Sequence, residues 1–261
     1  MIRAIFFDID GTLVSLKSKV YSASTADALE QLHRKGILVY VATGRSRFEI
    51  SEEHMLDGLY FDGYLTNNGQ VALDADGNTI YSKPIDPKEA EAVLQIAQKL
   101  GLAIWIAAEN GNIVSHYNER VRMAMQSIHT ALPPIGDVWD ALRRPIHKIV
   151  LFADAEEMRQ VMRYAPHCRS TQWYEFGRDV MSVEGGKHNA MREILQARGI
   201  DLSETMAFGD SENDIEMLRC AQIGVAMGNA TPEAKAAADY VTDDEDADGI
   251  RNALLHFGLI E

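Results

Sequence analysis

Two carboxylates stand at the end of a short apolar segment near the start of the chain. Residues 4–9 have the pattern of a buried β-strand, and this strand delivers Asp8 and Asp10 just before Gly11. Side chains two residues apart in an extended backbone point the same way, so both carboxylates can face one small site. Such a pair could hold Mg²⁺, which offsets their repulsion, while one carboxylate acts as a nucleophile and the other transfers protons.

Two less specific interpretations use the same residues. Asp-x-Asp-Gly is common in acidic turns, and it partly resembles a calcium-binding loop. The calcium interpretation fails because Gly11 is fourth counting from Asp8, whereas the loop needs Gly at its sixth position and Glu at its twelfth. The acidic run at 243–249 fails as well, since Leu255 is twelfth counting from Asp244. The pair alone therefore leaves a catalytic site and an acidic turn open.

Composition limits the kinds of protein this chain can be. Its 261 residues, 46% of them hydrophobic, suit one or two globular domains with an ample core. The net charge of −14 argues against binding to nucleic acid or to an anionic membrane. Cys168 and Cys220 are far apart, and the first residues carry no signal-peptide pattern. We expect a cytoplasmic monomer with free thiols.

A second predicted strand, residues 37–42, also ends in polar residues. Thr43, Gly44 and Arg45 supply a hydroxyl, a residue that permits close approach, and a guanidinium, which together suit an anion. An ordinary strand-to-helix turn, with Thr43 or Ser46 capping the helix, is the alternative.

The C-terminal part of the chain adds a lysine and two more carboxylates. Lys187 opens a predicted helix, where the helix dipole disfavours a cation unless an anion lies nearby. The strand 205–208 is followed by Asp210 and Asp214, which are four residues apart and can lie on one side of a helix beginning near Ser211. Three strands thus bring carboxylates or an anion-binding triplet to one sheet edge, where open α/β sheets bind ligands. This coincidence favours an enzyme.

The elements that must position these residues alternate between strand and helix. We predict an α/β, Rossmann-like and mostly parallel sheet domain from residues 1–81 and 184–261, interrupted by an α+β domain over 82–183. The expected helices are 24–35, 46–57, 87–100, 118–130, 156–164, 188–198 and a last one near the C-terminus. Ser24 is the expected N-cap of the first helix, and Asp248 that of the last. The further expected strands are 64–66, 70–73, 79–81, 102–107, 112–116, 146–152, 223–226 and 240–242. The strand 64–66 leads to Asn67-Asn68-Gly69 and to a hairpin around residues 74–78, which is expected as a structural turn. Asn110-Gly111 is expected as a second turn, and Trp105, Trp139 and Trp173 as core of the inserted domain.

Taken in order, these motifs resemble a known superfamily. The segments Asp8-x-Asp10-Gly11-Thr12, Thr43-Gly44-Arg45, Lys187 and Gly209-Asp210-x-x-Asn213-Asp214 are similar to the four motifs of the haloacid dehalogenase superfamily. The long insertion between the second and third motifs resembles the cap of its type IIB, or Cof-like, phosphatases. The chain departs from the family pattern at His188, because a Gly commonly follows the lysine.

The resemblance implies a Mg²⁺-dependent phosphatase that acts on small phosphorylated metabolites. We predict sugar phosphates such as hexose phosphates as substrates, with pyridoxal phosphate or flavin mononucleotide, and a phosphomutase of the same fold, as alternatives. A binding module without catalysis is disfavoured because the whole set of motif residues is present. The resemblance implies that Asp8 is the nucleophile, that Asp10 is the general acid and base, and that Thr43 and Lys187 stabilise the transferring phosphoryl group. It implies that Asp8, Asp210 and the backbone carbonyl of Asp10 bind Mg²⁺, and that Asp214 and Asn213 orient these metal ligands. Substrate binding is implied for Gly44, Arg45 and Asn213. Periodicity does not decide which of Glu109, Asn110, Trp173, Tyr174 and Arg178 contacts the substrate.

Overall fold

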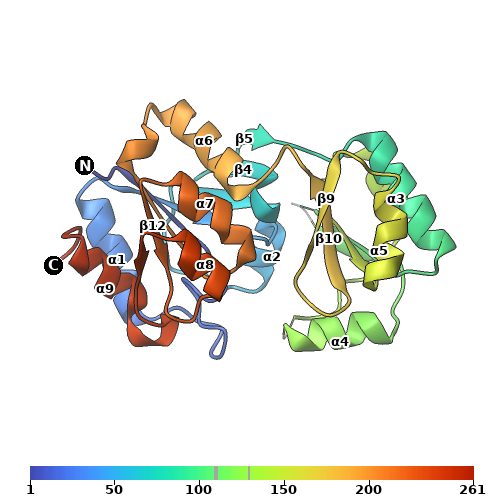
Figure 1. Cartoon of the computed structure of the whole chain (residues 1–261), viewed down its shortest axis with the longest axis horizontal. Coiled ribbons are helices and arrows are strands. Elements are labelled where there is room, and N and C mark those ends of the chain that lie inside the picture. Colours follow the sequence, from blue (N-terminus) through green and yellow to red (C-terminus); the bar gives the residue numbers. More distant parts are fainter. Residues whose placement is uncertain (109–110, 129) are drawn as a thin grey trace. The chain divides into compact units, whose positions relative to one another are not determined.

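The computed structural model describes residues 1–108, 111–128 and 130–261, and it divides into two compact units. The core unit consists of Met1–Ser82 and Gly186–Glu261, and the inserted unit is Lys83–Gly185 (Figure 1). The turn residue Asn110, the candidate Glu109 and His129 lie outside the described residues.

An eight-stranded sheet with the order β13-β12-β11-β1-β2-β3-β4-β5 forms the centre of the core unit. Neighbouring strands from β13 to β3 are parallel, and β4 and β5 add an antiparallel edge. The carboxyl ends of β1, β2 and β11 therefore meet at one edge, which confirms the predicted fold class. The strands are β1 Ala4–Phe7, β2 Leu38–Ala42, β3 Gly63–Thr66, β4 Val71–Asp74, β5 Thr79–Ser82, β11 Thr205–Gly209, β12 Ile223–Ala226 and β13 Tyr240–Val241.

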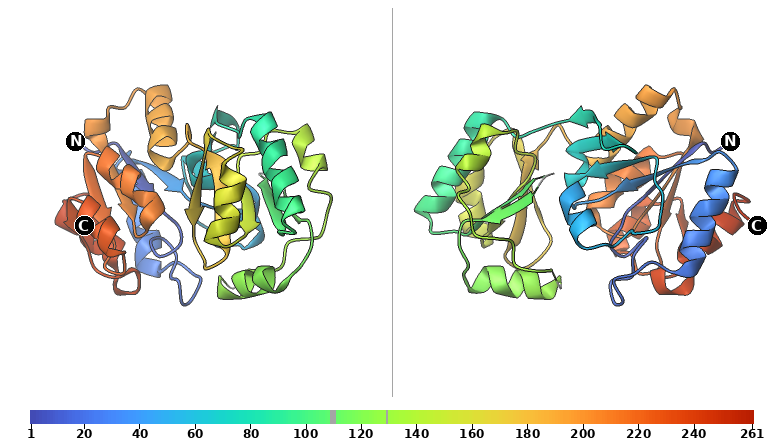
Figure 2. Two further views of the ribbon diagram at one scale, coloured as in Figure 1. Left: turned by 45° about the vertical axis from the view of Figure 1, so that its right-hand side comes forward. Right: turned by 180° about the vertical axis from the view of Figure 1, so that it is seen from behind.

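Helices cover both faces of this sheet. Helices α6, α7 and α8 pack on one face, whereas α1 and α9 pack together on the other (Figures 1 and 2). Covered on both sides, β1, β2 and β11 are continuous apolar runs with almost no exposed surface. The helices are α1 Ala23–Arg34, α2 Arg47–Glu52, α6 Lys187–Arg198, α7 Ile215–Cys220, α8 Pro232–Ala237 and α9 Gly249–His256, with short 3₁₀ turns η1 Asn67–Gly69, η3 Leu202–Glu204, η4 Glu212–Asp214 and η5 Glu245–Ala247.

The inserted unit is an antiparallel sheet of order β7-β6-β8-β10-β9 with its own helices. Alternation along β6 sends Ile104 and Ile106 into one apolar cluster with α3 and α5, and Trp105 into a second cluster with α4. Trp105 is buried, as expected, but Trp139 and Trp173 are only half-buried against these clusters. The elements are α3 Pro87–Lys99, β6 Ile104–Ala108, β7 Gly111–Val114, α4 Glu119–Ser127, η2 Asp140–Arg143, β8 Ile149–Phe152, α5 Ala155–Met162, β9 Cys168–Gln172 and β10 Gly177–Ser182.

Two of the predicted helix ends described next are wrong, and a third is right in position but has no side-chain capping bond. The N-cap of α1 is Ser22, whose hydroxyl accepts a hydrogen bond from the Thr25 backbone N–H, whereas Ser24 bonds to the carboxylate of Asp248. Asp248 is the N-cap residue of α9, as predicted, but its backbone is left-handed (φ 58°) and its side chain makes no hydrogen bond to this helix. Helix α2 ends at Glu52, short of residue 57, because the backbone turns left-handed at His54 (φ 53°).

No helix in the described ranges is both long enough and apolar enough to cross a membrane.

A half-buried histidine makes the inserted unit sensitive to acid. Partial loss of hydration lowers the pKa of His147 to about 4 from 6.5, so between these values the unfolded chain binds a proton that the folded unit does not. Stability should therefore fall as the pH is lowered, and the His147→Gln variant should lose about 2 kcal/mol less between pH 7 and pH 5. Urea unfolding followed by tryptophan fluorescence measures this, since all three tryptophans lie in the inserted unit. His116→Gln, at an exposed position of the same unit, is the control and should leave the acid loss unchanged.

Candidate active site

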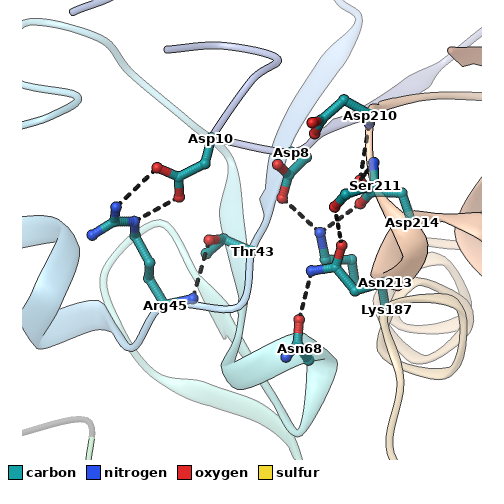
Figure 3. A network of polar contacts seen from close by, with 10 residues as sticks. All are labelled: Asp8, Asp10, Thr43, Arg45, Asn68, Lys187, Asp210, Ser211, Asn213 and Asp214. Carbon is teal, nitrogen blue, oxygen red and sulfur yellow. Dashed lines mark hydrogen bonds and ion pairs between the residues drawn. The ribbon is translucent and has the colours of Figure 1, made fainter. Parts of the chain in front are cut away.

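The polar residues predicted from three strand ends meet at one edge of the core sheet. Asp8 follows β1 directly, Thr43 follows β2, and Asp210 follows β11 (Figure 3). Asp8 and Asp210 are buried, and Thr43 is only 1% exposed. The parallel order of these strands places residues from distant parts of the sequence side by side.

Lys187 is buried between two carboxylates. Its Nζ lies 2.6 Å from Asp8 Oδ1 and 2.6 Å from Asp214 Oδ1, and the residue is 2% exposed. Burial alone would lower the pKa of Lys187, but the charges of Asp214 and Asp8 raise it above its ordinary value. The lysine is therefore a fixed ammonium group at the first position of α6. The two carboxylates supply the anions that this helix end needs.

Asp214 directs both of its oxygens at protein donors. Oδ1 accepts from Lys187, while Oδ2 accepts from the backbone N–H groups of Asp210 at 3.0 Å and Ser211 at 3.1 Å. Asp214 thereby holds the loop after β11 in place and orients Lys187. These hydrogen bonds leave Asp8 and Asp210 as the better ligands for a cation.

The carboxylates of Asp8 and Asp210 fit a hard divalent cation. Ligand oxygens of Asp8, Asp210 and Asp214 all lie within 4.8 Å of one another. Asp210 Oδ1 is buried and accepts no hydrogen bond from the part of the chain that the structure describes. Burial, with the charges of Asp8 and Asp214, raises the pKa of Asp210, as burial does for Asp8 in spite of Lys187. A cation such as Mg²⁺ would supply the partner that Asp210 Oδ1 needs.

Gly11 makes room for this carboxylate. Its backbone has φ 80°, and a Cβ atom there would lie 2.6 Å from Asp210 Oδ2. A side chain at this position would therefore both strain the turn and displace Asp210.

The Asp10 carboxylate points toward Arg45, whereas the Asp8 carboxylate points toward Lys187. An extended backbone led us to expect both carboxylates to face one small site. Both of its oxygens accept hydrogen bonds from Arg45, with Nε–Oδ2 at 2.7 Å and Nη2–Oδ1 at 2.8 Å (Figure 3). A third N–H group of Arg45 donates to Glu53 at 2.8 Å. Burial alone would raise the pKa of Asp10, but the hydrogen bonds and charge of Arg45 outweigh it and lower the pKa. Two neighbouring aspartates therefore have opposite electrostatic surroundings.

Thr43 and Gly44 lie between these two groups of charges. The Thr43 hydroxyl oxygen accepts from the Arg45 backbone N–H at 3.1 Å, so the hydroxyl can still donate its proton to a bound group. A Cβ atom on Gly44 would lie 3.1 Å from Asn68 Oδ1, which explains why a small residue stands here.

Asn68 is a member of the site to which the sequence patterns assign no role. Its Oδ1 accepts from Asn213 Nδ2 at 2.8 Å, and Asn213 Oδ1 accepts from the Ser211 hydroxyl at 2.6 Å. Asn68 and its neighbour Asn67 have left-handed backbones, φ 56° and 50°, as asparagine does more readily than most residues. The available signal was that Asn67 and Asn68 follow β3, a fourth strand that ends in polar residues at this edge.

Gly69, the last residue of η1, lets the start of α6 come close. A Cβ atom on Gly69 would lie 2.4 Å from the carbonyl atoms of Gly186 and 2.5 Å from the Lys187 nitrogen. The backbone N–H of Gly186 also donates to the Gly69 carbonyl at 3.3 Å. The turn after β3 therefore determines where Lys187 begins its helix.

The candidate substrate-binding residues Trp173, Tyr174 and Arg178 make the following contacts with other residues of the inserted unit. Trp173 Nε1 donates to Asp179 at 2.9 Å, and Arg178 Nε donates to the Ala153 carbonyl at 3.2 Å. Tyr174 packs against the apolar cluster that contains Trp105.

Comparison with known proteins identifies relatives over nearly the whole chain. Residues 5–254 match the family model of haloacid dehalogenase-like hydrolases. YkrA, a candidate phosphatase of Bacillus subtilis, is 30% identical over 99% of each chain. The structure of BT1666, a phosphatase of this superfamily from Bacteroides thetaiotaomicron, superimposes with a TM-score of 0.92 at 31% identity, covering 100% of this chain and 96% of that one. The structure of BT4131, a subclass IIB sugar phosphatase, has a TM-score of 0.85 at 37% identity, covering 99% and 100%.

Replacing Gly69 by alanine should disturb the site more than the same change at an open turn. Both Gly69 (φ 72°) and Gly77 (φ 86°) are left-handed, but a Cβ atom on Gly77 has no neighbour within 4 Å. Gly77→Ala should lower the free energy of unfolding by about 1 kcal/mol, and Gly69→Ala by roughly 2–4 kcal/mol, because the latter also pushes against the backbone of Gly186. Urea unfolding followed by circular dichroism measures both, and equal losses would contradict this account of Gly69.

Proposed function

The chain belongs to the family of haloacid dehalogenase-like hydrolases, and on this premise we propose that it is a phosphatase that hydrolyses small sugar phosphates through Asp8. The observation that carries the proposal is the buried Asp8 carboxylate, held by Lys187 at the sheet edge beside the unpartnered Asp210 oxygen. One oxygen of Asp8 is fixed by the lysine, which leaves the other to face a substrate or a cation. This is an oriented nucleophile beside an anion-binding group.

In the first step, an Asp8 oxygen attacks the phosphorus atom. The bond between phosphorus and the leaving sugar oxygen breaks, and Asp10 donates a proton to that oxygen. The products are an aspartyl-phosphate on Asp8 and the free alcohol of the sugar. In the second step, Asp10 takes a proton from water as the water oxygen attacks phosphorus. The Asp8–phosphate bond then breaks, which releases inorganic phosphate, frees the Asp8 carboxylate and leaves Asp10 protonated for the next cycle.

Lys187 and Thr43 are proposed to stabilise the phosphoryl group during both steps. The Lys187 ammonium and the Thr43 hydroxyl are buried donors at the same edge as Asp8, where they need no reorganisation during transfer. Gly44 and Asn213 are proposed to contact the substrate, and the bond from Asn68 fixes the Asn213 amide.

Asp8, Asp210 and the backbone carbonyl of Asp10 are proposed to hold Mg²⁺, with Asp214 orienting them through the loop after β11. The bound ion would neutralise charge on the phosphoryl oxygens. Because all these ligands are oxygen atoms, the site favours Mg²⁺ over metals that prefer nitrogen or sulfur ligands.

Sugar phosphates are proposed as substrates because a sugar phosphatase, BT4131, is 37% identical to nearly the whole chain. The inserted unit is proposed to act as the cap that selects the leaving group, since an insertion with its own core can vary while the catalytic sheet stays constant. The expected cytoplasmic location and monomeric state stay predictions.

Phosphate release is the direct test of the proposed activity. With Mg²⁺ present, the protein should release phosphate from p-nitrophenyl phosphate and from some members of a hexose phosphate panel, and Asp8→Asn should lower kcat by about 10³-fold or more because it removes the nucleophile. Asp76→Asn, in an exposed turn, is the matched control and should keep full activity.

The panel also separates the alternatives. Faster turnover of pyridoxal phosphate or flavin mononucleotide than of any sugar phosphate would reject the proposed substrate class. Turnover that needs a sugar bisphosphate activator and releases no phosphate would indicate a phosphomutase.

The melting temperature tests the metal site without relying on activity. Mg²⁺ should raise the melting temperature of the wild-type protein by about 3 °C or more at saturation, and Asp210→Asn should abolish most of this rise. In the absence of Mg²⁺, Asp210→Asn should melt no lower than the wild type, because the change removes a like charge beside Asp8.

The acidic turn at Asp244–Asp246 provides the control. Asp246→Asn changes the exposed residue of that acidic cluster and should leave the Mg²⁺-dependent rise intact. If Mg²⁺ no longer raised the melting temperature of Asp246→Asn but still raised that of Asp210→Asn, the metal site would lie at the acidic turn and not at Asp210.

A further inference from the structure

Asp10 is held in a geometry in which it cannot perform the proton transfers of the proposed mechanism. Its two oxygens both face the guanidinium of Arg45, at 2.7 Å and 2.8 Å, in the paired arrangement that is among the strongest hydrogen-bonded contacts of a carboxylate. A proton donor must turn one oxygen toward the leaving sugar oxygen, and a base must turn one toward water. At least one of the two bonds to Arg45 must therefore break in each half of the reaction.

Arg45, in contrast, is anchored from three directions that do not involve Asp10. Its backbone N–H donates to Thr43 Oγ1 at 3.1 Å, and its carbonyl accepts from the Asn67 N–H at 2.9 Å. Its Nη1 donates to Glu53 at 2.8 Å, so the guanidinium retains an anionic partner when Asp10 turns away. Glu53 itself is the C-cap residue of α2, and this helix begins with a complete capping box at Ser46.

The exposed fractions of the two side chains agree with a fixed Arg45 and a mobile Asp10 carboxylate. The Asp10 side chain is 32% exposed, whereas that of Arg45 is 14% exposed. Gly11 next to Asp10 has no side chain to obstruct a rotation of the carboxylate. The guanidinium is enclosed, and the carboxylate has room to turn.

We propose that Arg45 is a positioning residue that holds Asp10 between the catalytic steps, and that Glu53 anchors Arg45 so that Asp10 can leave and return. This inference rests on the proposed phosphatase function. It gives Arg45 a role that acts through Asp10, in place of the direct substrate contact that the family resemblance implies.

Two substrates with different leaving groups distinguish these roles. An alkyl phosphate, such as a sugar phosphate, has a poor leaving group and depends strongly on a correctly placed proton donor, whereas p-nitrophenyl phosphate depends on it little. The value kcat/KM reports events up to the first phosphoryl transfer. A defect in positioning Asp10 should therefore lower kcat/KM for the alkyl substrate more than for the aryl substrate.

The experiment measures the ratio of these two kcat/KM values in Arg45→Met, Arg45→Lys and Glu53→Gln. Arg45→Met should lower the alkyl-to-aryl ratio by about 10-fold or more. Arg45→Lys keeps the charge but loses the paired geometry, and Glu53→Gln loses the anchor, so both should lower the ratio by a smaller factor. Arg47→Met is the matched control, because that guanidinium lies 4.1 Å from the centre of the Tyr64 ring and contributes to neither carboxylate bond of Asp10. Its ratio should equal that of the wild type.

The outcomes separate the inference from the function on which it rests. Equal loss for both substrates in Arg45→Met would overturn the inference, because it indicates contact with the phosphoryl group that both substrates share. An unchanged ratio in all three variants would also overturn it while leaving the phosphatase function intact. Failure of the wild type to release phosphate from either substrate would reject the proposed function and the inference with it. If Arg45→Met does not fold, the ratios in Arg45→Lys and Glu53→Gln decide.

Discussion

The ion pair of Lys187 with Asp8 and Asp214 is the interaction on which the rest of the site depends. A buried ammonium loses most of its hydration, and only well-placed carboxylates at hydrogen-bonding distance compensate for that loss. Three separate segments meet this requirement together: the end of β1 supplies Asp8, η4 supplies Asp214, and the close approach of Gly69 to Gly186 sets the start of α6. The lysine thereby fixes the orientation of the nucleophile.

A second ionic cluster, formed by Arg45, Asp10 and Glu53, lies next to the first and shifts the pKa of its aspartate in the opposite direction. Burial raises the pKa of Asp8 and the arginine lowers that of Asp10, although the two residues are only two positions apart. Different surroundings allow two chemically identical side chains to take different roles, one as nucleophile and one in proton transfer.

Much of the fold follows from local patterns. The apolar runs of β1, β2 and β11 predict buried parallel strands because their side chains have no polar face to expose, and polar residues directly after each run predict a functional edge. Helix ends are harder, because several nearby residues can cap and the tertiary contacts select among them. Ser24 is an acceptable N-cap by type, but its hydroxyl bonds to Asp248, 224 residues away, and Ser22 takes the capping role.

The sequence by itself determined which residue types stand at the strand ends, and therefore the family, the predicted nucleophile and the acidic cluster suited to Mg²⁺. These are local features, and a motif of a few residues specifies them. Only the tertiary structure decided which charged and polar side chains pair with one another. Lys187 and Asp8 are 179 residues apart, Asn68 and Asn213 are 145 apart, and Arg45 takes both oxygens of Asp10 from 35 residues away. Such pairings depend on strand order and on close approaches at glycine, which no local pattern contains, because hydrogen bonding and electrostatic attraction act through space rather than along the chain.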